Sequence, residues 1–86
     1  MRHNQRLTFE DLRDETKTAV EGFATSQAAL ARELGVTRGA VNRAMKEAGP
    51  ALASLQGRII EHLTGYRIEE EVEVTFRALR KESGQK

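Results

Sequence analysis

The fold of this chain is decided by the stretch SQAALARELGVTRGAVNRAMK, residues 26–46. Ser26 can cap a short helix, and Gly35 can end it because glycine accepts the positive φ that a β-carbon resists. Thr37 is placed to cap a second helix, in which Val41 faces inward. Two helices joined by so short a turn must cross steeply. The stretch therefore predicts a pair of short, steeply crossing helices.

Five residues of this stretch stand at the spacing of a helix-turn-helix. They are a small residue where the helices cross (Ala31), a glycine in the turn (Gly35), an apolar residue that fills the turn (Val36), a helix cap (Thr37) and an inward aliphatic residue (Val41). Together they resemble the helix-turn-helix of phage Cro and repressor proteins. The segment GVTRGAV is similar to the reading unit of the KorA-like plasmid repressors of the TrfB family. The resemblance implies a homodimeric repressor that binds a palindromic operator through its second helix.

The open side of the second helix carries groups suited to reading DNA. Recognition helices enter the major groove by their N-terminal turns, so Arg38 and Arg43 should face base edges. Arginine makes bidentate contacts to guanine and asparagine to adenine, while glycine removes bulk where the helix comes closest. Gln27, Thr37 and Lys46 are placed to meet phosphates. The predicted DNA-binding residues are Gln27, Thr37, Arg38, Gly39, Asn42, Arg43 and Lys46.

Amphipathic patterns on both sides of this pair predict two further helices. Residues 7–23 place apolar side chains at helical spacing, with Thr8 as the N-cap. Residues 51–63 repeat the pattern after Pro50, although Gly57 within them costs about 1 kcal/mol relative to alanine. The expected fold class is mainly α (α+β), a helix-turn-helix bundle of about four helices with a C-terminal β-strand. The expected boundaries are a helical DNA-binding domain over 1–64 with the helix-turn-helix at 26–47, a dimerisation strand over 65–79 and a flexible tail over 80–86.

After Gly65 apolar and charged residues alternate, which predicts a strand of about ten residues. No second strand is evident in the sequence, and a lone strand exposes unpaired backbone groups along both edges. Pairing with the same strand of a second copy would resolve this in a two-fold antiparallel ribbon. Such a strand resembles the dimer arm of Cro rather than the helical end of the KorA family. The predicted dimer-interface residues are Ile68, Val72, Val74, Phe76 and Arg77.

Charge favours two registers for this ribbon. A ribbon centred on Glu73 pairs Glu69 with Arg77, and one centred on Val74 pairs Glu71 with Arg77. Opposite charges directly across a strand pair stabilise it, whereas like charges destabilise it. We therefore expect the dimer to adopt one of these two registers.

The composition excludes several classes of protein. The 86 residues include no Cys, so disulfides and thiolate metal sites are ruled out and a reducing cytoplasm is expected. No apolar run approaches the roughly 20 residues of a membrane span.

The net charge of +1 argues by itself against a nucleic-acid binder. Three cations and no acid lie between Thr37 and Lys46, however, so base contacts are expected to supply a large share of the affinity.

Two other classes of function compete with DNA binding. An antitoxin-like interaction module would use the C-terminal strand to bind a partner protein, and its helix-turn-helix would serve autoregulation. An enzyme is not expected, because no nucleophile–base pair, metal cluster or phosphate loop can be assembled. We expect His3 and His62 at the surface, the glutamates of 69–73 on a solvated face, and residues 1–6 in a frayed terminus. No cofactor, metal, membrane or small-molecule ligand is expected.

Overall fold

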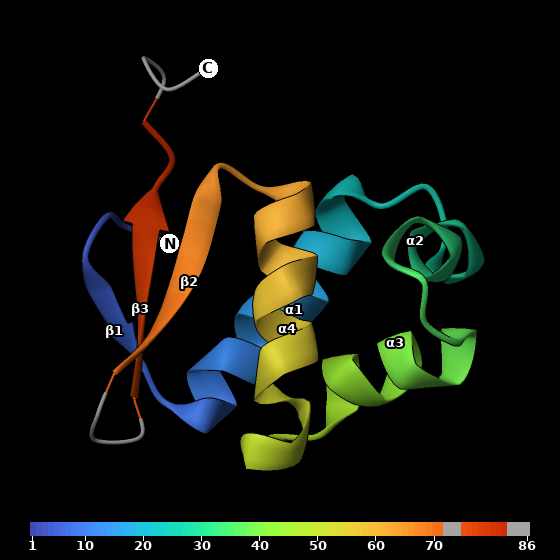
Figure 1. The fold of residues 1–86 in the computed structure, drawn as a ribbon, viewed down its shortest axis with the longest axis horizontal. Coiled ribbons are helices and arrows are strands. Elements are labelled where there is room, and N and C mark those ends of the chain that lie inside the picture. Colours follow the sequence, from blue (N-terminus) through green and yellow to red (C-terminus); the bar gives the residue numbers. More distant parts are fainter. Residues whose placement is uncertain (72–74, 83–86) are drawn as a thin grey trace.

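The computed structural model describes residues 1–71 and 75–82, and within them the chain forms four helices and one three-stranded antiparallel sheet. The elements in chain order are β1 (Gln5–Leu7), α1 (Phe9–Phe23), α2 (Gln27–Leu34), α3 (Arg38–Lys46), α4 (Pro50–Leu63), β2 (Tyr66–Glu71) and β3 (Thr75–Arg80). The sheet lies at one end of the molecule and α2 and α3 at the other, with α1 and α4 between them (Figure 1). The fold is thus mainly helical with a small sheet, in agreement with the expected α+β class.

Side-chain caps fix where the helices begin. The Thr8 hydroxyl accepts from the N–H of Asp11, and the Asp11 carboxylate accepts from the N–H of Thr8, which makes a reciprocal capping box at α1. Ser26 and Thr37 each accept from the N–H three residues ahead, at the starts of α2 and α3. Pro50 is the first residue of α4, where its missing N–H removes no helical hydrogen bond. These four starts agree with the sequence predictions.

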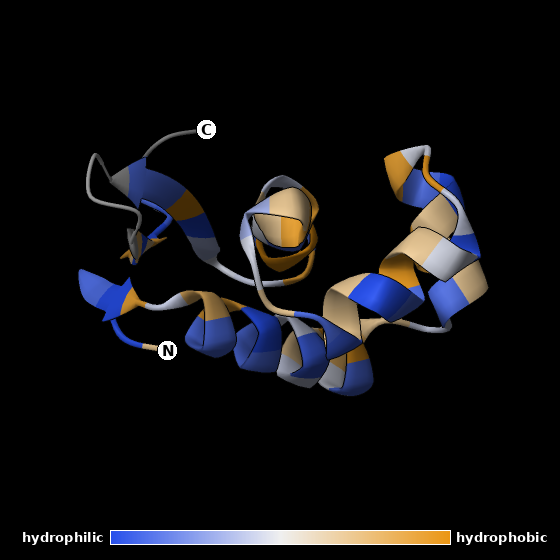
Figure 2. Ribbon diagram, turned by 90° about the horizontal axis from the view of Figure 1, so that it is seen from below, coloured by the Kyte–Doolittle hydropathy of each residue, from blue (hydrophilic) through white to orange (hydrophobic). Residues whose placement is uncertain are grey.

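The helix α4 belongs to both halves of the core. One cluster of buried apolar side chains joins α4 to α1 and the sheet, and comprises Leu7, Leu12, Ala53, Ile60, Phe76 and Ala78. A second cluster joins α4 to α1, α2 and α3, and comprises Val20, Leu30, Ala31, Val41, Ala44 and Ile59. Seen end-on, α4 is the mostly apolar helix between the sheet and the α2–α3 pair (Figure 2). Its neighbouring residues Ile59 and Ile60 therefore hold the two ends of the molecule together.

The C-terminal region differs from the sequence prediction, because it forms two strands instead of one. β2 and β3 pair antiparallel within the chain, and β3 also pairs with β1, so the sheet order is β1-β3-β2. Glu69 lies opposite Arg77, the charge pairing expected for a ribbon centred on Glu73, but both residues belong to one chain. Glu71 lies opposite Thr75, so the register that pairs Glu71 with Arg77 does not occur between these two strands. Folding back within one chain avoids the translational and rotational entropy cost of recruiting a second copy.

The predicted dimer ribbon rests on a C-terminal strand without a partner in its own chain, and these strands are instead paired and packed against the core. Phe76, a predicted interface residue, is only 4% exposed and lies in the first cluster, and Ile68 packs against the same cluster. Residues 5–7, expected to belong partly to a frayed terminus and partly to a helix, form β1 because they pair with β3. Arg80, expected in the flexible tail, is the last residue of β3. Val72 and Val74 of the predicted interface and residues 83–86 of the predicted tail lie outside the described residues.

Gly57 offers a test of the packing between α4 and the sheet. A β-carbon at Gly57 would meet the Ile68 β-carbon at 3.5 Å, an ordinary van der Waals contact. We therefore expect Gly57→Ala to raise the free energy of unfolding, by up to about 1 kcal/mol, because alanine is the better helix former. Gly35→Ala is the contrasting variant: at a φ of 71° the added β-carbon should lower the free energy of unfolding by about 1–2 kcal/mol. Urea unfolding measures both, and a Gly57→Ala protein less stable than the wild type would contradict this packing.

Candidate nucleic-acid interface

The link between α2 and α3 has the geometry that its sequence requires. Gly35 takes a left-handed conformation with a φ of 71°, and its N–H donates to the carbonyl of Arg32 at 3.3 Å. The N–H of Val36 donates to the carbonyl of Ala31 at 3.0 Å, which completes a Schellman motif at the end of α2. Ala31 is buried in the cluster that joins α2 to α3, as expected for a small residue between two closely packed helices.

All seven predicted DNA-binding residues lie on α2, on α3 or at the N-cap of α3. The exposed ones are Thr37, Arg38, Gly39, Arg43 and Lys46, and the partly buried ones are Gln27 and Asn42. At 3.6 residues per turn, those from Arg38 to Lys46 fall within an arc of about 140° around α3. Val41 and Ala44 are fully buried on the opposite side. The helix α3 therefore presents one continuous polar face, which we call the reading face.

Two residues of the reading face already have polar partners. The side-chain amide of Asn42 donates to that of Gln27 at 3.5 Å, so the start of α2 and the middle of α3 are joined at the surface. Arg43 Nη2 lies 3.4 Å from Glu47 Oε1, and both side chains are more than half exposed, at 60% and 53%. An exposed pair at this spacing contributes only about 0.3–0.5 kcal/mol, so Arg43 can leave Glu47 at little cost. Glu47 follows directly after the acid-free stretch 37–46 and places a negative charge beside the reading face.

A hollow of about 480 Å³ continues the polar surface from α3 onto α1. Its lining residues are Arg13, Asp14, Lys17 and Glu21 of α1, Gln27 of α2, and Asn42, Met45 and Lys46 of α3. The structure therefore brings two cations of α1 next to three of the predicted DNA-binding residues. Sequence reasoning missed Arg13 and Lys17 because it described their helix by its acids. Their spacing of four residues, which places both on one helix face, was the available signal.

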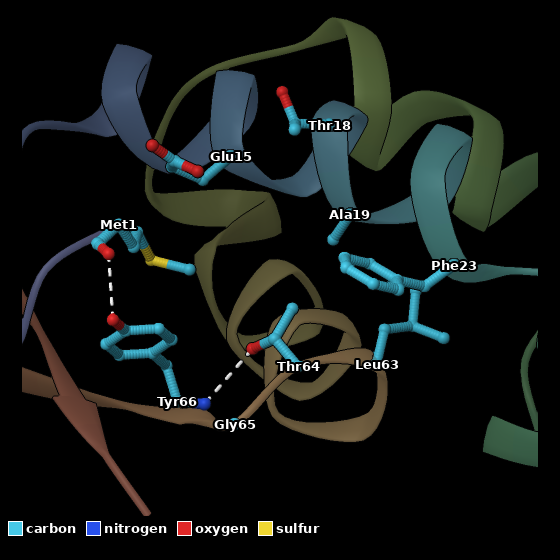
Figure 3. Close-up of a pocket in the computed structure, with 9 residues that line it drawn as sticks. All are labelled: Met1, Glu15, Thr18, Ala19, Phe23, Leu63, Thr64, Gly65 and Tyr66. Atoms are coloured by element: carbon cyan, nitrogen blue, oxygen red, sulfur yellow. Dashed lines mark hydrogen bonds between the residues drawn. The ribbon is translucent and has the colours of Figure 1, made fainter.

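A second hollow, of about 390 Å³, lies where the C-terminal ends of α1 and α4 meet the start of β2 (Figure 3). Its mostly apolar walls are formed by Met1, Glu15, Thr18, Ala19, Phe23, Leu63, Thr64, Gly65 and Tyr66. The Tyr66 hydroxyl donates to the Met1 carbonyl at 2.8 Å, and the Tyr66 N–H donates to the Thr64 hydroxyl at 3.1 Å. None of the predicted DNA-binding residues lines it, and the sequence did not indicate it.

Both histidines lie at the surface, as expected, and each has a partner within the chain. His62 Nε2 lies 2.7 Å from Glu33 Oε1, a contact that joins α4 to α2. His3 Nδ1 accepts from the N–H of Arg80 at 3.0 Å. Within residues 1–71 and 75–82, no three His, Asp or Glu side chains are grouped so that they could hold a metal ion. None of the helices described above combines the length and the apolar character needed to cross a membrane.

The cap of α3 can be tested separately from any DNA contact. The Thr37 hydroxyl accepts from the N–H of Ala40 at 3.0 Å. Thr37→Ala removes this acceptor and should lower the free energy of unfolding by about 1 kcal/mol, whereas Thr37→Ser keeps the hydroxyl and should change it little. Thermal unfolding of the two variants measures the difference. Equal destabilisation by alanine and serine would show that the hydroxyl does not cap α3.

Comparison with known proteins assigns no role to this surface. The chain matches no protein-family model, no curated protein and no solved structure. The contacts, the exposure and the charge of the α2–α3 pair are therefore the features that bear on its function.

Proposed function

We propose that this protein is a sequence-specific DNA-binding transcriptional regulator, in which α2 and α3 act as a helix-turn-helix and α3 reads the major groove. The observation that carries the proposal is the reading face, on which Arg38, Gly39 and Arg43 are exposed together. The N-terminal turn of a recognition helix approaches base edges most closely, and Arg38 and Gly39 occupy that turn. The resemblance to Cro and to the TrfB family favours a repressor of phage or plasmid type.

Gly39 supports this proposal because the fold itself does not demand a glycine there. It is the second residue of α3, and a β-carbon on it would meet only the Thr37 hydroxyl, at 3.9 Å. A glycine in a helix costs up to about 1 kcal/mol relative to alanine, the full value applying in the helix interior. Close approach of the helix backbone to another molecule would explain why this position carries no side chain. A major-groove edge close to the first turn of α3 is such a molecule.

Affinity would come from a few directional contacts rather than from a strong general attraction. A bidentate arginine discriminates its base by about 1–3 kcal/mol. The net charge is only +1, and Glu47 stands beside Arg43, so the positive field around the reading face is limited. Lys17 and Lys46, which line the hollow between α1 and α3, would add phosphate contacts that position the helix without specifying sequence.

A homodimer on a palindromic operator is part of the proposal. Two recognition helices about 34 Å apart would engage successive major-groove faces of the duplex. The predicted ribbon does not supply this dimer, because β3 is the central strand of the sheet and Phe76 is buried in the core. The second copy therefore has to dock on another surface of the molecule.

The antitoxin-like alternative loses support from the sheet. That alternative requires an open edge on the C-terminal strands, onto which a partner protein adds a strand of its own. β3 is paired on both sides, and in the outer strand β2 the N–H of Ile68 donates to the Glu61 carboxylate at 2.9 Å. A side chain that covers an edge group in this way protects a sheet against further pairing. We therefore favour the DNA-binding function.

Selection of binding sites from a random double-stranded DNA library, followed by gel shift on the enriched site, tests the proposal. Arg38→Ala and Arg43→Ala should each cost about 1–3 kcal/mol of binding free energy on that site. Arg67→Ala is the matched control, because Arg67 is an exposed cation on β2 at the other end of the molecule. Failure to enrich any sequence, or an equal loss with Arg67→Ala, would refute the proposal.

Gly39 allows stability and binding to be separated. Gly39→Ala should raise the free energy of unfolding by up to about 1 kcal/mol, because it removes a glycine from a helix without a steric clash. Binding to the enriched site should nevertheless weaken with Gly39→Ala, and further with Gly39→Gln, because each added atom keeps the helix away from the groove. Unfolding curves and gel shifts on the same preparations measure both effects. Unchanged binding by Gly39→Gln would contradict a close approach at this position.

A further inference from the structure

The buried side chain of Gln56 connects α4 to the end of α3. Gln56 is 0% exposed, and its Nε2 donates to the carbonyls of Ala44 and Glu47, each at 2.8 Å. Both carbonyls belong to the C-terminal end of α3, where the last four carbonyls have no partner within the helix. One amide from α4 thus satisfies two of these four groups.

The same helix makes a corresponding contact with α2. Arg58 Nη2 donates to the carbonyl of Leu34, the last residue of α2, at 2.6 Å. One turn later, His62 Nε2 lies 2.7 Å from the carboxylate of Glu33. Through separate side chains, α4 therefore holds the C-terminal ends of both helices of the pair.

We propose that α4 is a clamp that sets the orientation of α3 relative to α2, with Gln56 as the positioning residue, and that this clamp determines how sharply the reading face discriminates between DNA sequences. The second half of this inference rests on the function proposed above. The first half concerns the protein alone and can be tested without DNA.

A glutamine at position 56 is better suited to holding the end of α3 by hydrogen bonds than to filling space in the core. Burial strips an amide of its hydration, and Gln56 Oε1 is a buried acceptor without a hydrogen-bond partner among the described residues. A methionine of similar length would fill the same space without that unsatisfied oxygen. It would also leave the Ala44 carbonyl without its hydrogen-bond donor. A buried carbonyl without a donor destabilises the fold, and Gln56 avoids this cost. The glutamine is thus matched to the end of α3.

The end of α3 is close to residues that would contact DNA. Arg43 directly precedes Ala44, and Lys46 directly precedes Glu47, so the two carbonyls held by Gln56 are those that follow two cations of the reading face. A bidentate base contact tolerates only a small displacement of the helix that carries it. Contacts of long, flexible lysine or arginine side chains with phosphates tolerate a larger displacement, because they depend on charge and not on the fixed geometry of two parallel hydrogen bonds. Loosening α3 should therefore reduce discrimination more than general affinity.

Backbone amide hydrogen exchange of the protein without DNA tests the clamp. Gln56→Met should speed exchange at residues 44–47 by about tenfold, because it removes two hydrogen bonds from that turn. Arg58→Met is the matched control: it removes a donor of the same helix and should speed exchange at the end of α2 instead. Exchange at the end of α3 that is unchanged in Gln56→Met, or equally faster in Arg58→Met, overturns the clamp whether or not the protein binds DNA.

The wild-type protein provides a second measurement that does not require a folded variant. Because Gln56 Nε2 donates to two carbonyls, both of its side-chain protons should exchange about tenfold or more slowly than those of Gln5, which lies in an edge strand. Equal exchange of the two side chains would show that Gln56 does not hold the end of α3.

The consequence for DNA is measured on the site that the wild type selects and on a scrambled duplex of the same composition. Gln56→Met should lower the ratio of the two affinities by about fivefold or more, while its affinity for the scrambled duplex stays within about twofold of the wild type. An equal loss on both duplexes overturns the positioning role. If the wild type selects no sequence, the proposed DNA function fails, and the exchange measurements still decide whether the clamp exists.

Discussion

The position of α4 between the sheet and the α2–α3 pair is the constraint on which the rest of the structure depends. Ile59 and Ile60 are adjacent in sequence and fully buried, but they lie in different clusters. Burying each is worth about 1.5–3 kcal/mol, and a chain of 86 residues has no larger core to replace them. The sheet and the reading face therefore depend on one helix. The hydrogen bonds of Gln56 and Arg58 also fix how α4 is oriented relative to α3 and α2. Hydrogen bonds depend on the angle between donor and acceptor, whereas apolar contacts do not.

The surface around α3 carries charges of both signs, in keeping with a chain whose net charge is only +1. The hollow between α1 and α3 is lined by the cations Arg13, Lys17 and Lys46 and also by the acids Asp14 and Glu21. Two of the cations near α3 are paired with neighbours in the sequence, Arg13 with Asp14 at 2.9 Å and Arg43 with Glu47 at 3.4 Å. On the proposed function, such a surface would attract phosphates only weakly, and its affinity for DNA would depend on the geometry of its side chains. The proposed clamp would matter most on such a surface, because it would set the position of the side chains of α3.

The C-terminal strands show where reasoning from alternation fails. Alternation correctly indicated β structure after Gly65. One of the two registers that charge favoured between two copies pairs Glu69 with Arg77, and these residues lie opposite each other within one chain. Alternation could not show whether the partner lies in the same chain, because residues 72–74 continue the pattern without a glycine, proline or asparagine to indicate a turn. The three residues of β1 are too few to establish a period, so a strand at 5–7 could not be inferred. Alternating residues therefore predict a strand, but they do not predict which strand it pairs with.

The sequence by itself determined the features that depend on neighbouring residues. The N-caps Thr8, Ser26 and Thr37 and the left-handed Gly35 follow from interactions across a few positions, so residue type and spacing suffice to predict them. Only the tertiary structure decided which strands pair, which cations of α1 line a hollow with α3 and which side chain contacts the end of α3. The last of these joins residues twelve positions apart on two different helices. No periodicity in the sequence records such a contact, because it exists only once the two helices have packed together.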